Sequence, residues 1–219
     1  MVNNNLFIIF GLHRSGTSAT AGVLHHLGVN MGRKMLKGAK SNPKGHFENI
    51  EFLKINDYIL SSVQSSWDHP PLLSEIENTE IDKNILRQFV HTHQSQYWGL
   101  KDPRALLTYN LWKPFLEESS TITYIFVYRP FEESVKSLVN RNGFSVEKSK
   151  NILNLYLEQR ERLRINLAQE HADIIDISFD QLLINPADFV NHINSRINQA
   201  PNNQMVKVKQ FLDKNLKNF

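Results

Sequence analysis

The sequence predicts an α/β fold in which a central parallel sheet lies between two layers of helices. Two observations carry this prediction. Short apolar or β-branched runs, typical of strands, alternate along the chain with longer segments whose apolar residues recur at helical spacing. The first run also passes directly into a turn bracketed by two glycines and then into a helix. Helical connections between successive strands favour parallel pairing, because a parallel pair needs a long crossover.

Four strands are expected, at residues 6–10, 97–101, 121–128 and about 174–177. Residues 6–10 are apolar without interruption, as in a parallel strand buried on both faces. Residues 121–128 are β-branched or aromatic nearly throughout, which makes this run the clearest strand in the chain. The expected sheet therefore draws its strands from the whole length of the sequence.

Helices are expected from Thr17 to Leu27, which Gly28 would end, and from about residue 49 to 63. Residues 79–82 resemble a weak capping box for a helix that continues to about His93. Asp102 and Pro103 form an expected N-cap and first helical residue. Further helices are expected to begin between residues 129 and 137, to span 145–170 and to follow residue 201.

The length of 219 residues favours one domain over residues 1–219. Hydrophobic residues make up 41% and charged residues 21%, which excludes a disordered or fibrous chain. The absence of cysteine excludes thiolate nucleophiles and thiolate metal sites. No segment approaches the length of a membrane span or reads as a signal peptide, so the expected location is cytoplasmic. A net charge of +3 is mild, and no stripe of alternating aromatic and basic residues indicates a nucleic-acid partner.

Gly11 and Gly16 bracket the turn after the first strand, and Thr17 and Ser18 follow them at the helix start. Glycines let the backbone approach a ligand closely, and the first N–H groups of a helix bind anions. The turn therefore predicts a phosphate cradle. Compared with the nucleotide-binding template G-x-x-x-x-G-K-[ST], it lacks the lysine after the second glycine. Arg14 supplies a cation inside the loop instead.

These residues resemble the sulfotransferase family, whose loop for 3'-phosphoadenosine 5'-phosphosulfate (PAPS) carries Lys or Arg before Ser-Gly-Thr. The resemblance implies a P-loop NTPase-like sulfotransferase fold with PAPS as co-substrate and no metal. Its expected cofactor-binding loop consists of Gly11, His13, Arg14, Ser15, Gly16, Thr17 and Ser18.

Three further segments resemble the same family, at residues 41–49, at residues 98–104 and around Arg129 and Ser137. Residues 41–49 resemble its Asn-Pro-x-Gly-aromatic-Glu segment beside the acceptor pocket, and residues 98–104 resemble its Lys-Asp-Pro-Arg segment. The resemblance implies that Lys101 faces the transferring sulfuryl group and that Arg129 and Ser137 bind the 3'-phosphate. Pro130 departs from the family pattern, which usually has proline one position later.

The sequence offers three candidates for the general base: Glu48, His46 and Asp102. Asp102 is expected to cap a helix, which would occupy its carboxylate. An ordinary histidine titrates near neutral pH, which favours His46, whereas Glu48 matches the family's glutamate and would need partial burial. We expect Glu48 to be the base and His46 to assist it, with Lys101 and Arg14 as the catalytic cations.

The expected activity is transfer of a sulfuryl group from PAPS to a hydroxyl or amine of a glycan, lipid, peptide or small metabolite. Cationic side chains can stabilise the leaving phosphate without a metal. One alternative is an ATP- and magnesium-dependent kinase, although Arg129 stands where such an enzyme typically has a metal-binding Asp. The other is a nucleotide-binding protein of the same fold without catalysis. Trp67, in a loop, either lines a pocket or covers the core.

Overall fold

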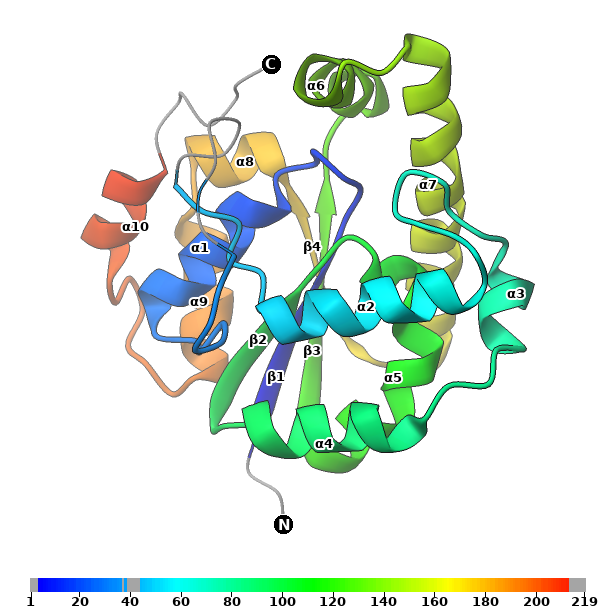
Figure 1. Ribbon diagram of the computed structural model, residues 1–219. Coiled ribbons are helices and arrows are strands. Elements are labelled where there is room, and N and C mark those ends of the chain that lie inside the picture. Colours follow the sequence, from blue (N-terminus) through cyan, green and yellow to red (C-terminus); the bar gives the residue numbers. More distant parts are fainter. Residues whose placement is uncertain (1–3, 37, 39–43, 213–219) are drawn as a thin grey trace.

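The computed structural model describes residues 4–36, 38 and 44–212, and in these ranges it has a four-stranded sheet (Figure 1). The strands are β1 (Asn5–Phe10), β2 (Tyr97–Lys101), β3 (Thr121–Tyr128) and β4 (Asp173–Ser178). They lie in the order β2-β1-β3-β4, and every pair is parallel. All four expected strands are confirmed, with β1 and β4 slightly longer than predicted.

Helices cover both faces of this sheet because alternate residues of its strands point to opposite sides. In β1, Leu6, Ile8 and Phe10 belong to one hydrophobic cluster, and Phe7 and Ile9 belong to another. The first cluster is completed by α2 (Ile50–Ser62), α3 (Leu73–Glu77), α4 (Lys83–His93), α5 (Ala105–Ser119), α6 (Phe131–Asn142) and α7 (Val146–Gln169). The second is completed by α1 (Thr17–Leu27), α8 (Phe179–Ile184), α9 (Ala187–Arg196) and α10 (Met205–Phe211). The predicted three-layer α/β architecture is therefore confirmed.

Local sequence signals explain where several helices begin and end. The Asn49 side chain caps α2 by accepting hydrogen bonds from the backbone N–H groups of Glu51 and Phe52. Ser145 caps α7 in the same way, and Gly28 ends α1 with a left-handed backbone at φ 102°. These boundaries agree with the expected ones to within a residue.

Two expected helix starts are wrong. Helix α4 begins at Lys83 behind an Asp82 cap, so residues 79–82 are no capping box, and the Thr79 hydroxyl lies 3.0 Å from that of Ser62 instead. Helix α5 begins at Ala105 rather than Pro103. The Asp102 carboxylate accepts the Arg104 N–H, which closes a turn before the helix. At Asp102 the side chain bonds a nearby backbone N–H outside the helix, and at Thr79 it bonds another side chain in place of the helix start.

Parallel strands bring their carboxyl ends to one edge, where loops after different strands meet. The register pairs Ile9 with Lys101, the last residue of β2, and Phe10 with Phe126 near the end of β3. The glycine-bracketed loop, Lys101 and Arg129 therefore leave the sheet at the same edge. Within the described ranges, no helix is both long and apolar enough to cross a bilayer.

Candidate active site

The loop from Gly11 to Gly16 joins β1 to α1 and is held in a narrow conformation. A Cβ on Gly11 would lie 2.6 Å from Thr17 Cγ2 and 2.7 Å from Ser15 Oγ, so a side chain there would displace the loop. Gly16 has φ 96°, and a Cβ on it would lie 2.3 Å from the Phe179 ring. The loop therefore requires glycine at both positions.

The N-terminus of α1, which is the positive end of the helix dipole, lies at this loop. Its first backbone hydrogen bond runs from Ala19 N to Gly16 O, so the N–H groups of Gly16, Thr17 and Ser18 precede the helical pattern. Such groups bind anions. Ser15, which the sequence placed among the binding residues, turns its fully buried hydroxyl inward to donate to Leu12 O at 2.8 Å. Its side chain stabilises the loop from within.

Arg14, Arg129 and Ser137 lie together beside the loop, although three different segments supply them. Arg14 Nε donates to Ser137 Oγ at 3.0 Å, and Arg129 Nη1 donates to the Arg14 backbone oxygen at 2.9 Å. Arg129 Nε also donates to Glu133 at 3.0 Å. Arg14 has a left-handed backbone at φ 69°, which costs an L-residue roughly 1–2 kcal/mol. The structure thus brings together three residues that the sequence assigned to one nucleotide.

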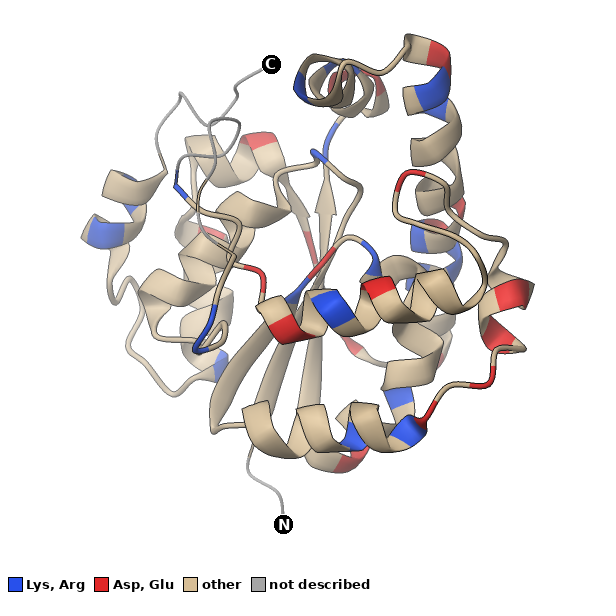
Figure 2. Ribbon diagram, viewed as in Figure 1, with Lys and Arg blue, Asp and Glu red and all other residues tan. Residues whose placement is uncertain are grey.

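Positive charge accumulates at this edge, where Figure 2 shows basic positions between the tip of β3 and α6. Burial, followed by the charges of Arg141 and Arg129, lowers the pKa of Arg14 to about 10. An anion bound here would relieve that repulsion, so the residues present fit a phosphate-bearing ligand. Across the described residues, no group of three or more His, Asp or Glu side chains is arranged to hold a metal ion.

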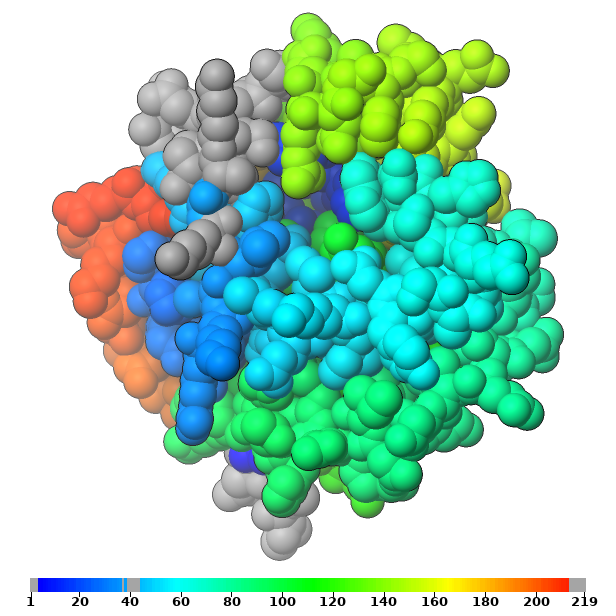
Figure 3. Space-filling view, viewed as in Figure 1, coloured from blue at the N-terminus to red at the C-terminus, as the bar shows by residue number. Residues whose placement is uncertain are grey.

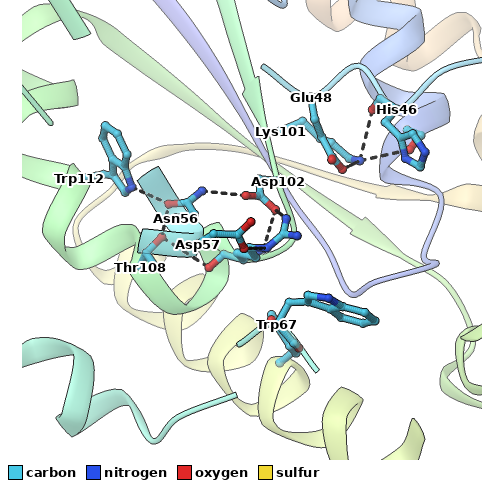
Figure 4. Close-up of polar contacts among 12 residues, drawn as sticks. His46, Glu48, Asn56, Asp57, Trp67, Lys101, Asp102, Thr108 and Trp112 are labelled. Atoms are coloured by element: carbon cyan, nitrogen blue, oxygen red, sulfur yellow. Dashed lines mark hydrogen bonds and ion pairs between the residues drawn. The ribbon is translucent and has the colours of Figure 1, made fainter. Parts of the chain in front are cut away.

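Lys101 lies at the centre of the edge, and its side chain is only 3% exposed. Its ammonium donates to Glu48 Oε1 at 2.5 Å, to Ser18 Oγ at 3.2 Å and to the His46 backbone oxygen at 3.3 Å (Figure 4). These bonds account for the three hydrogens of an ammonium group. Lys101 therefore joins the start of α1 to the segment that carries two of the base candidates.

Asp102 belongs to a separate buried network (Figure 4). Its carboxylate is fully buried and accepts from the Asn56 amide at 2.9 Å and from Arg104 Nη1 at 2.9 Å. The Asn56 oxygen accepts in turn from Thr108 and Trp112. Burial raises the pKa of Asp102, Arg104 opposes the shift, and Glu48 adds to it. With both oxygens engaged, this carboxylate serves the structure of the strand end.

His46 has a buried side chain close to several cations. Burial, followed by the charges of Lys101, Arg141 and Arg14, lowers its pKa to about 4. The ordinary pKa that favoured His46 in the sequence therefore does not apply in the folded protein, where the ring is neutral at pH 7 and a weaker base than a free imidazole.

His13 and Trp67 connect the phosphate loop to the loop between α2 and α3. The His13 ring lies 4.9 Å from the Trp67 ring and 4.7 Å from that of Tyr156. Burial and the nearby cations, Arg104 first, lower the pKa of His13 well below its ordinary value, so it is neutral. The Tyr156 hydroxyl donates to Trp67 O at 3.1 Å. Trp67 therefore packs over the phosphate loop as well as against the core.

The space-filling view shows a hollow at this edge (Figure 3). Its floor is dark blue and green, the colours of the first residues and of those just after 100. The cyan segment that includes α2 and the yellow-green α6 and α7 form its rim. An acceptor molecule would reach the phosphate loop and the end of β2 through this opening.

Sequence reasoning missed two residues of the site. Asn56 is fully buried within the apolar stripe of α2, between Phe52 and Ile59. A polar residue in such a stripe indicates a buried, hydrogen-bonded side chain, so the sequence could have revealed it. Phe47 has φ 53°, a left-handed conformation that no sequence signal indicates for an aromatic residue. Of the segment resembling the acceptor loop, residues 41–43 lie outside the described residues.

The architecture and the strand-end loop define the class: this chain has a sulfotransferase-like fold. A solved structure that matches it is the sulfotransferase STF9 from Mycobacterium avium, at a TM-score of 0.55 and 12% sequence identity. The match covers 95% of this chain and 67% of the other. No family model and no curated protein sequence matches the chain. The likeness is therefore one of fold.

Proposed function

We propose that the protein is a sulfotransferase that uses PAPS. The observation that carries this proposal is the hydrogen-bonded group of Arg14, Ser137 and Arg129 beside the phosphate loop. A nucleotide with phosphates at its 5' and 3' positions needs two neighbouring cationic sites. The phosphate loop would be the first of these sites, and Arg129 with Ser137 would be the second. The fold and the sequence resemblance support the same reading.

The chain's own groups have distinct parts in this proposal. The N–H groups at the start of α1 and Arg14 bind the 5'-phosphosulfate, and Arg129 and Ser137 bind the 3'-phosphate. Lys101 stabilises the charge that grows on the leaving phosphate oxygen. Lys101 ends β2, Arg129 follows β3, and the N–H groups stand at the start of α1. Arg14 is hydrogen-bonded to Ser137 on α6, so most of the proposed nucleotide site is in place before binding.

PAPS supplies the sulfuryl group, which forms a bond to the acceptor oxygen or nitrogen as its bond to the phosphate breaks and 3'-phosphoadenosine 5'-phosphate leaves. Glu48 takes the proton that the acceptor loses. Its carboxylate is paired with Lys101 before substrates bind. Binding of the nucleotide draws Lys101 toward the phosphate, and Glu48 then turns to the acceptor.

A non-catalytic nucleotide-binding protein is the second candidate, and one observation favours it. Every hydrogen of the Lys101 ammonium already has a partner within the protein. If that arrangement persists when nucleotide binds, the lysine cannot stabilise a leaving group. The two functions therefore differ in whether the Glu48–Lys101 pair opens.

The test is incubation of the protein with PAPS and a panel of sugars, lipids, peptides and small metabolites, followed by mass spectrometry. A sulfated product that requires the protein and disappears with Glu48→Gln supports the proposal. Nucleotide binding without sulfated product from any acceptor class supports the non-catalytic candidate. Phosphorylated product with ATP and magnesium would establish the kinase instead.

A further inference from the structure

Phe47 lies between the two base candidates in an unusual backbone conformation. Its φ of 53° places it in the left-handed region, which large side chains adopt rarely. Non-glycine residues persist in this region when the surrounding structure holds them there. The contacts of the Phe47 side chain therefore hold this turn in place.

The Phe47 ring is 9% exposed and packs between α1 and α10. It meets the Phe211 ring edge-on, with centroids 5.7 Å apart and planes at 89°. Gly22 of α1 leaves room for both rings, because a Cβ there would lie 2.1 Å from Phe211 and 3.0 Å from Phe47. Lys44 Nζ donates to the Phe211 backbone oxygen, which ties the same segment to the end of α10.

The residues on either side of Phe47 contact one ammonium group. His46 offers its backbone oxygen and Glu48 its carboxylate to Lys101 Nζ. Beyond Glu48 the chain is already fixed, because the Glu48 backbone oxygen accepts from Leu36 N at 2.8 Å and Asn49 caps α2. The direction from which the chain enters Glu48 therefore depends on the turn at Phe47.

We propose that Phe47 is a positioning residue. It fixes the backbone from which the Glu48 side chain reaches Lys101 in the unliganded protein and the acceptor during transfer, and Gly22 and Phe211 form the contact site for its ring. Helix α10, the last helix described, thereby helps to build the active site. The kinetic consequence rests on the proposed function. The structural consequence, that the turn loosens without the ring, does not.

The kinetic test compares Phe47→Ala with Phe115→Ala, a matched control because Phe115 is also 9% exposed and lies on α5. Phe47→Ala should lower kcat on the order of tenfold to a hundredfold, the loss expected from a misplacement of about 1 Å. Affinity for 3'-phosphoadenosine 5'-phosphate should remain. The conservative Phe47→Leu should recover part of the rate. In a Glu48→Gln background, Phe47→Ala should cost nothing further.

An additive loss in that double variant, or equal effects of Phe47→Ala and Phe115→Ala on kcat, would overturn the proposal. The second measurement needs no activity: amide hydrogen exchange of residues 44–50 in the unliganded protein. Phe47→Ala and Gly22→Ala, which fills the contact site from the other side, should both speed exchange there, and Phe115→Ala should not. Unchanged exchange in both variants would overturn the proposal even if no acceptor is found. Faster exchange without any sulfation would contradict only the proposed function.

Discussion

Glu48 and Lys101 are buried together, so each depends on the other for its charge to be tolerated. Removing one partner of a buried ion pair typically costs about 3–5 kcal/mol, because the other charge is left without compensation. Lys101→Ala is therefore a poor kinetic probe, since it damages stability as well. Arg14 is half-buried and is the better cation to test.

Arg14→Ala should reduce turnover more than nucleotide affinity if the guanidinium acts on charge that grows on the leaving oxygen. The expected loss is roughly 3–4 kcal/mol of transition-state stabilisation, the effect of removing one such donor. Steady-state kinetics with PAPS, together with calorimetric titration of 3'-phosphoadenosine 5'-phosphate, separates the two effects. An affinity loss with kcat intact would assign Arg14 to ground-state binding.

Glu48→Gln should keep nucleotide binding and abolish most transfer, because the amide can still accept from Lys101 but cannot take a proton. His46→Ala should cost less, since the neutral ring is a weak base and its backbone oxygen, which contacts Lys101, remains. The measurement is kcat of both variants with one acceptor. Near-wild-type rate in Glu48→Gln with activity lost in His46→Ala would reverse the assignment.

His46 should make stability depend on pH in acid. Its folded pKa of about 4 lies below the ordinary 6.5, so the unfolded chain binds the proton first as pH falls. Its contribution to stability is complete above about pH 6.5 and is lost progressively toward pH 4. His46→Gln should reduce the slope of unfolding free energy against pH, by at most about 1.4 kcal/mol per pH unit and most strongly near the middle of this window. Urea denaturation from pH 4.5 to 6.5 measures it, with exposed His91→Gln as control, and an unchanged slope would contradict the burial of His46.

At the scale of elements, the Asn56 amide links α2 to the end of β2 and to α5. It donates to Asp102 and accepts from Thr108 and Trp112, all of them buried. A buried network of this kind is stable only while every member has its partners. It fixes the strand end that carries Lys101.

Asn56→Ala should therefore lower the unfolding free energy by about 3 kcal/mol or more, because it leaves a buried carboxylate short of a donor. The exposed Asn110→Ala is the matched control, since it removes a 2.9 Å hydrogen bond to Glu77 at the surface of α5. Chemical denaturation of both variants makes the comparison. Equal small effects would show that the network contributes little.

Strands β1 and β3 were predictable because burial on both faces leaves long runs of apolar and β-branched residues. Helix starts were predictable only where a capping side chain had no competing partner, as at Asn49 and Ser145. The Asp102 side chain could either cap the next helix or bond to other side chains. Its contacts with Asn56 and Arg104, which the sequence did not reveal, decided the outcome. The short helices α3 and α8 carry too few apolar repeats to predict. Helix α9 could have been predicted, because it has three apolar residues at helical spacing, Phe189, Val190 and Ile193.

For the whole molecule, the sequence indicated one edge of the sheet as the candidate site because the glycine-bracketed loop, Lys101 and Arg129 stand at the carboxyl ends of three parallel strands. It did not show which of these groups contact one another. The Lys101–Glu48 pair and the left-handed Phe47 depend on how α1, α10 and residues 44–48 pack, which no local pattern records.

The central claim is that one edge of the sheet binds a nucleotide with a 3'-phosphate, and a thermal-shift comparison of three ligands tests it most directly. A ligand that binds only the native state stabilises it by about 2.7 kcal/mol at a hundredfold excess over Kd. 3'-Phosphoadenosine 5'-phosphate should raise Tm well beyond AMP or ATP with magnesium, and Arg129→Ala should remove the difference. Equal shifts with AMP would contradict the 3'-phosphate site, and a larger shift with ATP and magnesium would favour a kinase.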